Sequence, residues 1–251
     1  MTQFTLSQLC QQLALPAVAS TVDQACESAQ RQQQPYSEFL LDLFHHEWEM
    51  RCQRRTMRRV KEAKFPWVKT LDSFDFQRAA HLPEVKLRQL AQGNYIADAE
   101  PIILIGEPGT GKTHLGCALG FAAAQQGHAV RFMMASQLVN LLVEAKDSRV
   151  LSSITQRFAR YKVLILDELG YLPLSKADSE LLFQVISQRQ ERLPIIITTN
   201  LPFSEWTSIF PDQRLCKALI DRITHRAHII ETGHQSVRFE ETIGQRQGGK
   251  K

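Results

Sequence analysis

The sequence lacks the features that would place the chain in a membrane, in an oxidising compartment or around a structural zinc ion. Its five cysteines are scattered and include no C-x-x-C pair, which argues against both a disulfide framework and a zinc site. The first residues, MTQFTLSQLC, have no basic region followed by an apolar one, and no apolar run approaches the roughly 20 residues of a spanning helix. These absences favour a cytoplasmic protein without a membrane partner.

Charge is unevenly distributed along a chain of ordinary globular composition. Of 251 residues, 43% are hydrophobic and 22% are charged, and the net charge is only +4. Residues 1–50 contain one basic and six acidic residues, whereas residues 51–69 contain eight basic residues and one acidic one. This abrupt change in charge predicts a surface that binds a polyanion. A solvated helix face, or one paired with acidic helices of a neighbouring copy, is the alternative.

The first 66 residues have helical patterns only. Leucines recur at three- and four-residue intervals over residues 6–13, in a pattern that stops near Pro16, and apolar residues recur in the same way over residues 39–44. The basic stretch continues this second helix, and Pro66 is expected to end it. We therefore predict a small all-helical N-terminal domain, residues 1–66, that carries a basic helix.

From about residue 100, short apolar runs alternate with segments of helix length. Four runs are rich in β-branched residues, and a fifth, AHIIE, is a candidate last strand; the four are PIILIG, AVRFMMA, KVLILDE and PIIITTN. This alternation predicts an α/β fold with a parallel sheet flanked by helices, over residues 67–243. Residues 244–251 contain nothing that could form a core, and we expect a flexible basic tail.

A glycine-rich segment, GEPGTGKT, follows the first apolar run and precedes a helical pattern. In this context, G-x-x-x-x-G-K-T is typical of a loop whose backbone N–H groups bind nucleotide phosphates. Lys112 would reach the β- and γ-phosphates, and the hydroxyl of Thr113 would ligate Mg²⁺. The predicted cofactors are therefore ATP and Mg²⁺. The residues expected at the nucleotide are Gly106, Glu107, Pro108, Gly109, Thr110, Gly111, Lys112, Thr113, His114 and Asp167.

Polar residues end two of the later apolar runs. Asp167 is expected to hold Mg²⁺ together with Thr113, and Glu168 is expected to activate the attacking water. Asn200 could hydrogen-bond the γ-phosphate and the water, although Asn before a Leu-Pro pair is also a common turn device. We therefore assign catalytic roles to Glu168 and Asn200.

The order of phosphate loop, acidic strand and Asn-tipped strand resembles that of the AAA+ ATPases. The strings DELGYLPL, FSEW, ALIDRITHRAHIIE and AKFPWVKTLDSFDF further resemble the IstB family of transposition helper ATPases, relatives of the DnaC helicase loaders. The resemblance covers essentially the whole chain. It implies an AAA+ ATPase that assembles as a homo-oligomer on double-stranded DNA without strong sequence preference, remodels that DNA, recruits an IstA-like transposase and is released by ATP hydrolysis.

The resemblance also assigns a role to Arg222, in the string ALIDRITH. It corresponds to an arginine finger that reaches the nucleotide of a neighbouring subunit, and a salt bridge with Asp221 or another carboxylate is the alternative. Arg226 and Arg238 are weaker candidates for this or a sensor role. Because the chain ends soon after residue 243, we expect no helical C-terminal lid of the kind found in larger AAA+ proteins.

Two basic zones are candidates for DNA contact. Arginines at three- and four-residue spacing place charge along one helix face, and Arg suits phosphate because its planar fork is bidentate. Contacts of this kind carry no sequence information. The first zone comprises Arg51, Arg54, Arg55, Arg58 and Arg59, and the second comprises Lys146, Arg149 and Arg157.

Three alternatives stay open at the level of sequence. A DnaC-like helicase loader would share the phosphate loop, and a non-catalytic scaffold would bind ATP only to assemble; Glu168 argues against the scaffold. Phe74 and Phe76 could line an adenine pocket, but packing in the core is the preferred interpretation.

Overall fold

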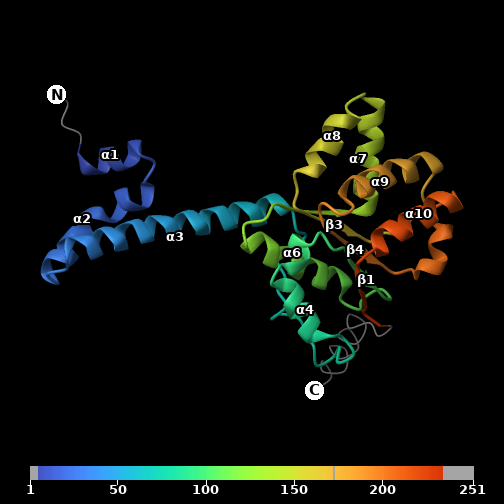
Figure 1. Cartoon of the computed structure of the whole chain (residues 1–251), viewed down its shortest axis with the longest axis horizontal. Coiled ribbons are helices and arrows are strands. Elements are labelled where there is room, and N and C mark those ends of the chain that lie inside the picture. Colours follow the sequence, from blue (N-terminus) through green and yellow to red (C-terminus); the bar gives the residue numbers. More distant parts are fainter. Residues whose placement is uncertain (1–4, 172, 234–251) are drawn as a thin grey trace, which may run out of the picture. The chain divides into compact units, whose positions relative to one another are not determined.

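A computed structural model describes residues 5–171 and 173–233. Internal contacts divide the chain into two compact units, and the division falls between Arg58 and Arg59, inside helix α3 (Tyr36–Ala63) (Figure 1). Predictions for Arg238 and for the tail 244–251 fall outside the described residues, and the predicted domain boundaries stay predictions. In the described part of the chain, no helix has both the length and the apolar character needed to cross a membrane.

The first unit contains α1 (Leu6–Gln12), α2 (Pro16–Arg31) and most of α3. Its buried core is small and is formed by Cys10, Val18 and Val22. The helical pattern expected to stop near Pro16 ends earlier, at Gln12, and Pro16 is the first residue of α2. Proline suits this position because its fixed φ matches a helix and its missing N–H would have had no partner there.

A buried carboxylate from α3 caps the beginning of α2. Glu47 accepts hydrogen bonds from the backbone N–H groups of Ala17, at 2.8 Å, and Val18, at 3.1 Å. Arg51 donates to the other oxygen of Glu47, at 2.8 Å, and also to the carbonyl oxygen of Ala14. Burial by itself raises the pKa of Glu47, but the hydrogen bonds from Arg51, Val18 and Ala17 outweigh it and lower the pKa below the ordinary value. The charged form of Glu47 thus joins α2 to α3.

The second unit is built on a five-stranded parallel sheet. The strands are β1 (Ile102–Ile105), β2 (Val130–Met134), β3 (Val163–Asp167), β4 (Ile195–Thr199) and β5 (His228–Glu231). Their order across the sheet is β2-β3-β4-β1-β5, and every neighbouring pair is parallel. The predicted α/β fold is confirmed, and each apolar run forms the expected strand. Consequently the residues that follow β1, β3 and β4 lie at one edge of the sheet.

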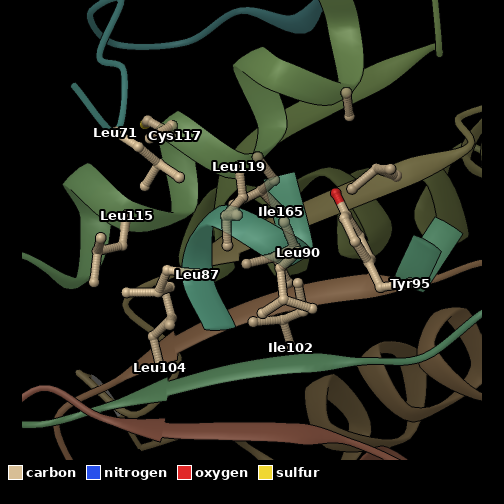
Figure 2. Packing of buried hydrophobic residues seen from close by; sticks show 14 of the residues in the cluster. Leu71, Leu87, Leu90, Tyr95, Ile102, Leu104, Leu115, Cys117, Leu119 and Ile165 are labelled. Atoms are coloured by element: carbon tan, nitrogen blue, oxygen red, sulfur yellow. The ribbon is translucent and has the colours of Figure 1, made fainter. Parts of the chain in front are cut away.

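Helices cover both faces of this sheet. On one face, α4 (Glu84–Ala91), α5 (Asn94–Ala97) and α6 (Lys112–Gln125) pack on alternate strand residues, including Ile102, Leu104 and Ile165 (Figure 2). The other face carries α7 (Ala135–Asp147), α8 (Leu151–Ala159), α9 (Lys176–Arg189) and α10 (Gln213–Thr224), and the turn of 3₁₀ helix Phe203–Ser208 packs there as well. Burial on both faces accounts for the continuous apolar strands.

The basic stretch continues α3, as predicted. The helix ends at Ala63, three residues before Pro66, and Lys64 adopts a left-handed conformation with φ of 59°. Ala63 is fully buried in the core beneath α4 and α6, where Val60 packs as well.

Replacing Glu47 by Gln tests the carboxylate cap of α2. At pH 7, we expect the stability of residues 16–22 against local unfolding to fall by about 1–2 kcal/mol, because a charged acceptor for two N–H groups is lost. Glu47 has a lowered pKa, so its contribution is present above the unfolded value of 4.5 and is lost as pH falls through the folded value. The difference between Glu47→Gln and wild type should therefore shrink below about pH 4.

Hydrogen exchange of peptides from α2, measured from pH 7 to pH 3.5 with correction for intrinsic rates, checks this. Glu49→Gln is the matched control, because the Glu49 side chain is 51% exposed. Equal protection of α2 in Glu47→Gln and Glu49→Gln would contradict the role given to Glu47.

Candidate functional site

The glycine-rich loop between β1 and α6 has the backbone conformation that its sequence predicts. Gly109 and Gly111 adopt φ values of 88° and 90°, in the left-handed region that favours glycine. A Cβ on Gly111 would lie 2.6 Å from the ring of Phe74, and one on Gly106 would lie 2.9 Å from the carbonyl oxygen of Gly233. Side chains at Gly106 and Gly111 would therefore collide with the residues packed around the loop.

Hydrogen bonds hold this loop, some within the loop itself and one from the residue that follows β5. Lys112 donates to the carbonyl oxygen of Glu107 at 2.7 Å, and the Thr110 hydroxyl donates to the same oxygen at 2.8 Å. The Thr110 hydroxyl also lies 2.6 Å from that of Thr232, which follows β5. The backbone N–H of Thr232 in turn donates to the carbonyl oxygen of Ile105 at 2.7 Å, and its hydroxyl lies 3.2 Å from the same oxygen. These contacts join the loop to the residue that follows β5.

Asp167, the last residue of β3, is buried and lies directly beside the loop. Thr113 donates to its two carboxylate oxygens at 3.0 and 3.1 Å, and Thr198 of β4 donates to Oδ1 at 2.6 Å. The sequence-based pairing of Thr113 with Asp167 is thus observed as a contact.

These oxygen donors fit a hard cation. Mg²⁺ prefers oxygen ligands and is commonly held by one or two carboxylates together with phosphate oxygens. Within the described residues, no cluster of three or more His, Cys, Asp or Glu side chains could hold a metal. A magnesium ion here would therefore depend on Thr113, Asp167 and the phosphates of a nucleotide.

Glu168 and Asn200 lie beside the same cleft. Glu168 adopts φ of 56°, which is uncommon for a residue with a side chain, and its N–H donates to the Thr198 hydroxyl at 2.9 Å. Together with Lys112 and Thr113, both residues line a cavity of about 530 Å³, within the usual range for small-molecule sites. The structure therefore brings Lys112, Thr113, Glu168 and Asn200 together around one cleft.

The segment that precedes the sheet forms another wall of this cleft. Trp67, Lys69, Ser73, Phe74 and Asp75 all line the cavity. Phe74 and Phe76 also pack against the core, as the sequence predicted, with ring centroids 4.9 Å apart. For Phe74, the two interpretations made from sequence are compatible, since its ring contacts both the core and the cleft.

His114 connects α6 to this wall. Its Nε2 lies 3.0 Å from the carbonyl oxygen of Thr70 and 3.3 Å from the hydroxyl of Ser73, and its ring meets that of Phe74 edge-on. Burial lowers the pKa of His114, and the nearby charge of Lys69 lowers it further, although the hydrogen bond with Thr70 raises it. The neutral ring is therefore favoured, and His114 lines the cleft without adding charge to it.

Arg222 lies far from this cleft. It lines a second cavity of about 290 Å³ together with Pro101 and Ile195, at the amino ends of β1 and β4. Its guanidinium lies 4.5 Å from the ring centroid of Phe183 and donates to the hydroxyl of Ser187. Among the ion pairs of the described residues, none joins Arg222 to a carboxylate. The alternative of a salt bridge with Asp221 is therefore absent.

Arg226, a weaker candidate for the arginine finger or a sensor role, donates a hydrogen bond to the carboxylate of Glu100 at 2.9 Å.

The two basic zones differ in how their side chains are engaged. Arg51 is bonded to Glu47 and Ala14, and Arg59 lies 3.4 Å from Glu62, whereas Arg54 and Arg55 are exposed. The second zone consists of exposed residues from the end of α7 to the last turn of α8; these are Lys146, Arg149 and Arg157.

Sequence reasoning missed two threonines that organise the site. Thr198 contacts both Asp167 and Glu168, and Thr232 holds the loop through Thr110. A signal existed for Thr198, because it stands two residues before Asn200 and strand alternation places both on one face. No local signal pointed to Thr232.

Comparisons with known proteins agree with this geometry. The sequence matches the family described as IstB-like ATP binding protein over residues 8–244. It is 36% identical over 236 residues to the insertion sequence IS21 ATP-binding protein of Pseudomonas aeruginosa, covering 94% of this chain and 89% of that protein. Identity is also 36% to the insertion sequence IS5376 ATP-binding protein of Geobacillus stearothermophilus, with 94% of each chain covered.

Solved structures share the fold. The DnaC helicase loader aligns with a TM-score of 0.58 at 23% identity, covering 67% of this chain and 99% of that one. AMPPCP-bound DnaA from Aquifex aeolicus aligns with a TM-score of 0.59 at 18% identity, covering 74% of this chain and 57% of that one. Little more than half of DnaA is thus matched, and at these identities the likeness concerns the AAA+ fold alone.

Proposed function

The chain belongs to the family of IstB-like ATP binding proteins of insertion sequences, and from this premise we propose that it is an ATP-hydrolysing helper of transposition. In this proposal, copies of the chain assemble on double-stranded DNA without strong sequence preference and remodel it. The assembly recruits or stimulates an IstA-like transposase, and ATP hydrolysis then releases it. Such a protein would act in the cytoplasm.

One observation carries the hydrolytic part of the proposal. The buried carboxylate of Asp167 contacts Thr113 of the phosphate loop, while Glu168 and Asn200 line the same cleft. A site that only bound nucleotide would need the loop but would have no use for a second carboxylate and an amide beside it. The combination favours phosphoryl transfer to water.

Each residue has a distinct chemical task in this mechanism. Backbone N–H groups of Gly109 and of residues 111–113 would hold the phosphates, and Lys112 would exchange the Glu107 carbonyl for a phosphate oxygen. Thr113 and Asp167 would hold Mg²⁺, which when bound neutralises charge on the phosphate oxygens. Glu168 would accept a proton from the attacking water, and Asn200 would orient that water.

The location of Arg222 supports a role in trans. Because Arg222 lies at the amino ends of the strands, it cannot reach the nucleotide cleft of its own subunit, which lies at their carboxyl ends. A guanidinium can stabilise the charge that develops on the γ-phosphate, and its supply by a neighbour would make hydrolysis depend on assembly.

The alternative of a helicase loader has less support. The likeness to DnaC concerns the fold, whereas the insertion-sequence relatives match nearly the whole chain at higher identity. Affinity capture with a transposase and with a replicative helicase as separate baits distinguishes the two functions.

Two substitutions in the cleft test hydrolysis. Lys112→Ala should abolish binding of a fluorescent ATP analogue, because the negative phosphates lose the positive charge of Lys112. Glu168→Gln should bind the analogue as wild type does but lower kcat by about 10²–10⁴-fold and keep the protein on DNA, because the base is lost. Phosphate release and DNA retention are the measurements, and Glu180→Gln, an exposed carboxylate on α9, is the control. Wild-type turnover by Glu168→Gln would show that Glu168 is not the base.

Mixing two inactive variants tests the trans role of Arg222. Arg222→Ala keeps an intact phosphate loop and Lys112→Ala keeps an intact Arg222, so a mixed interface can contain one complete site. We expect each variant alone to lose about 10³-fold or more in turnover, and the mixture to regain a measurable part of it. Arg214→Ala, on the same helix but exposed, should be active alone. Co-assembled mixtures without regained activity would exclude a finger that acts in trans.

A salt titration separates the two basic zones as DNA contacts. If Arg54, Arg55 and Arg58 meet phosphates, their joint replacement by Gln should weaken binding to unrelated duplexes alike. It should also flatten the slope of log affinity against log salt by about two to three units, since each contact contributes about 0.9. DNA-free turnover should not change.

The matched variant replaces Lys146, Arg149 and Arg157 by Gln, which removes the same number of charges between the end of α7 and the last turn of α8. If only this second variant flattened the slope, the DNA contacts would be assigned to Lys146, Arg149 and Arg157 and no longer to α3.

A further inference from the structure

Thr198 of β4 lies between the two carboxylates that the proposed mechanism assigns to metal binding and to catalysis. Its side chain is 1% exposed, and its hydroxyl contacts Asp167 Oδ1 at 2.6 Å and the N–H of Glu168 at 2.9 Å. Its carbonyl oxygen also accepts a hydrogen bond from the N–H of Leu169, at 2.9 Å. Thr198 therefore makes hydrogen bonds with three consecutive residues, from Asp167 to Leu169, where β3 ends and the turn begins.

The direction of these hydrogen bonds follows from the chemistry of a hydroxyl. A threonine hydroxyl has one proton to donate and can accept through its lone pairs. Because the Glu168 N–H can only donate, the hydroxyl accepts from it and directs its own proton to Asp167. The arrangement thus uses Asp167 as the hydrogen-bond acceptor and Glu168 as the donor.

The conformation of Glu168 makes this support necessary. Glu168 has φ of 56°, and a residue with a side chain adopts the left-handed region only where its surroundings stabilise it. Without the hydrogen bonds to Thr198, the backbone after Asp167 would be free to continue as an extended strand. The side chain of Glu168 would then no longer point into the cleft, where the proposed mechanism needs its carboxylate.

Two hydrogen bonds orient the Thr198 hydroxyl, which contacts Asp167 and the N–H of Glu168. A Cβ on Gly116 of α6 would lie 3.5 Å from the Thr198 methyl group, so the phosphate-loop helix packs over this residue. Thr198 and Asn200, both on the cleft side of β4, also line the same cavity.

We propose that Thr198 is a positioning residue for hydrolysis, which holds Glu168 in place through its backbone N–H and links it to Asp167 and to the strand of Asn200. The inference rests on the proposed ATPase function. It predicts that loss of the hydroxyl impairs turnover more than nucleotide binding, because Asp167 keeps its contact with Thr113.

The test compares four substitutions on β4. Thr198→Val and Thr198→Ala remove the hydroxyl, whereas Thr198→Ser retains it. Thr199→Val is the control, because Thr199 is equally buried but its hydroxyl contacts only the backbone of Leu201. We expect kcat on DNA to fall about 10–100-fold in the first two variants and to stay within about threefold of wild type in the Ser and Thr199 variants. Affinity for a fluorescent ATP analogue with Mg²⁺ should change by less than about threefold in all four.

Two further readouts isolate the positioning role. Thr198→Val should cause no additional loss of kcat in a Glu168→Gln background, because a residue that acts through Glu168 has nothing left to position. Hydrogen exchange at the Glu168 amide should be about tenfold faster in Thr198→Val and Thr198→Ala but unchanged in Thr199→Val.

The exchange measurement separates this inference from the proposed function, since it needs no turnover. Absence of hydrolysis in wild type would refute the ATPase proposal alone, whereas unchanged exchange at Glu168 would refute the role of Thr198 alone. Thr198→Ser keeps the inference falsifiable if the other variants fail to fold. Turnover of Thr198→Ser as low as that of Thr198→Ala would overturn it, as would independent losses in the double variant.

Discussion

The fold and the site depend on one buried carboxylate. Asp167 ends the central strand β3 and accepts hydrogen bonds from Thr113 of α6 and from Thr198 of β4. A charge removed from water is tolerated only where donors surround it, so this contact constrains how the helix and both strands approach one another. Gly116 of α6 lies over Thr198, where a Cβ would be in ordinary van der Waals contact with the Thr198 methyl group at 3.5 Å. Core packing and site geometry are therefore set by the same few contacts.

The strand order explains why the phosphate loop is well supported. Because β1 lies between β4 and β5, the loop that follows β1 has a neighbouring strand end on each side. The Gly106 N–H donates to the carbonyl oxygen of Thr199 at 3.2 Å, and the Glu107 N–H donates to that of Gly233 at 3.1 Å. The end of β5 therefore supports the loop from one side while β4 supplies Asn200 from the other.

Sequence reasoning succeeded where the information is local. Continuous apolar runs predict buried parallel strands, and all five strands formed as expected. The phosphate loop is recognisable from its own spacing, and the carboxyl ends of parallel strands bring Asp167, Glu168 and Asn200 to one edge. Each of these predictions needs only a short window of residues and the rule that parallel strands share a direction.

The sequence did not predict contacts between residues that lie far apart in the chain. Thr198 and Asp167 are 31 residues apart, and Glu47 is 30 residues from Ala17, so no local pattern predicts either contact. The same holds for the cleft wall formed by residues 67–75 and for the position of Arg222 over Phe183. Pro16 illustrates a second limit, since a proline that ends one helical pattern is equally suited to begin the next helix.

In the proposed function, Thr113 and Asp167 form the metal end of an ATP-hydrolysing site. A crystal structure of the chain with Mn²⁺ in place of Mg²⁺ and a non-hydrolysable ATP analogue tests this, because anomalous scattering locates the metal. We expect a manganese ion beside Thr113 and Asp167, with the triphosphate along residues 106–113 and the γ-phosphate facing Glu168 and Asn200. A metal bound away from Asp167, or a nucleotide bound outside this cleft, would contradict it.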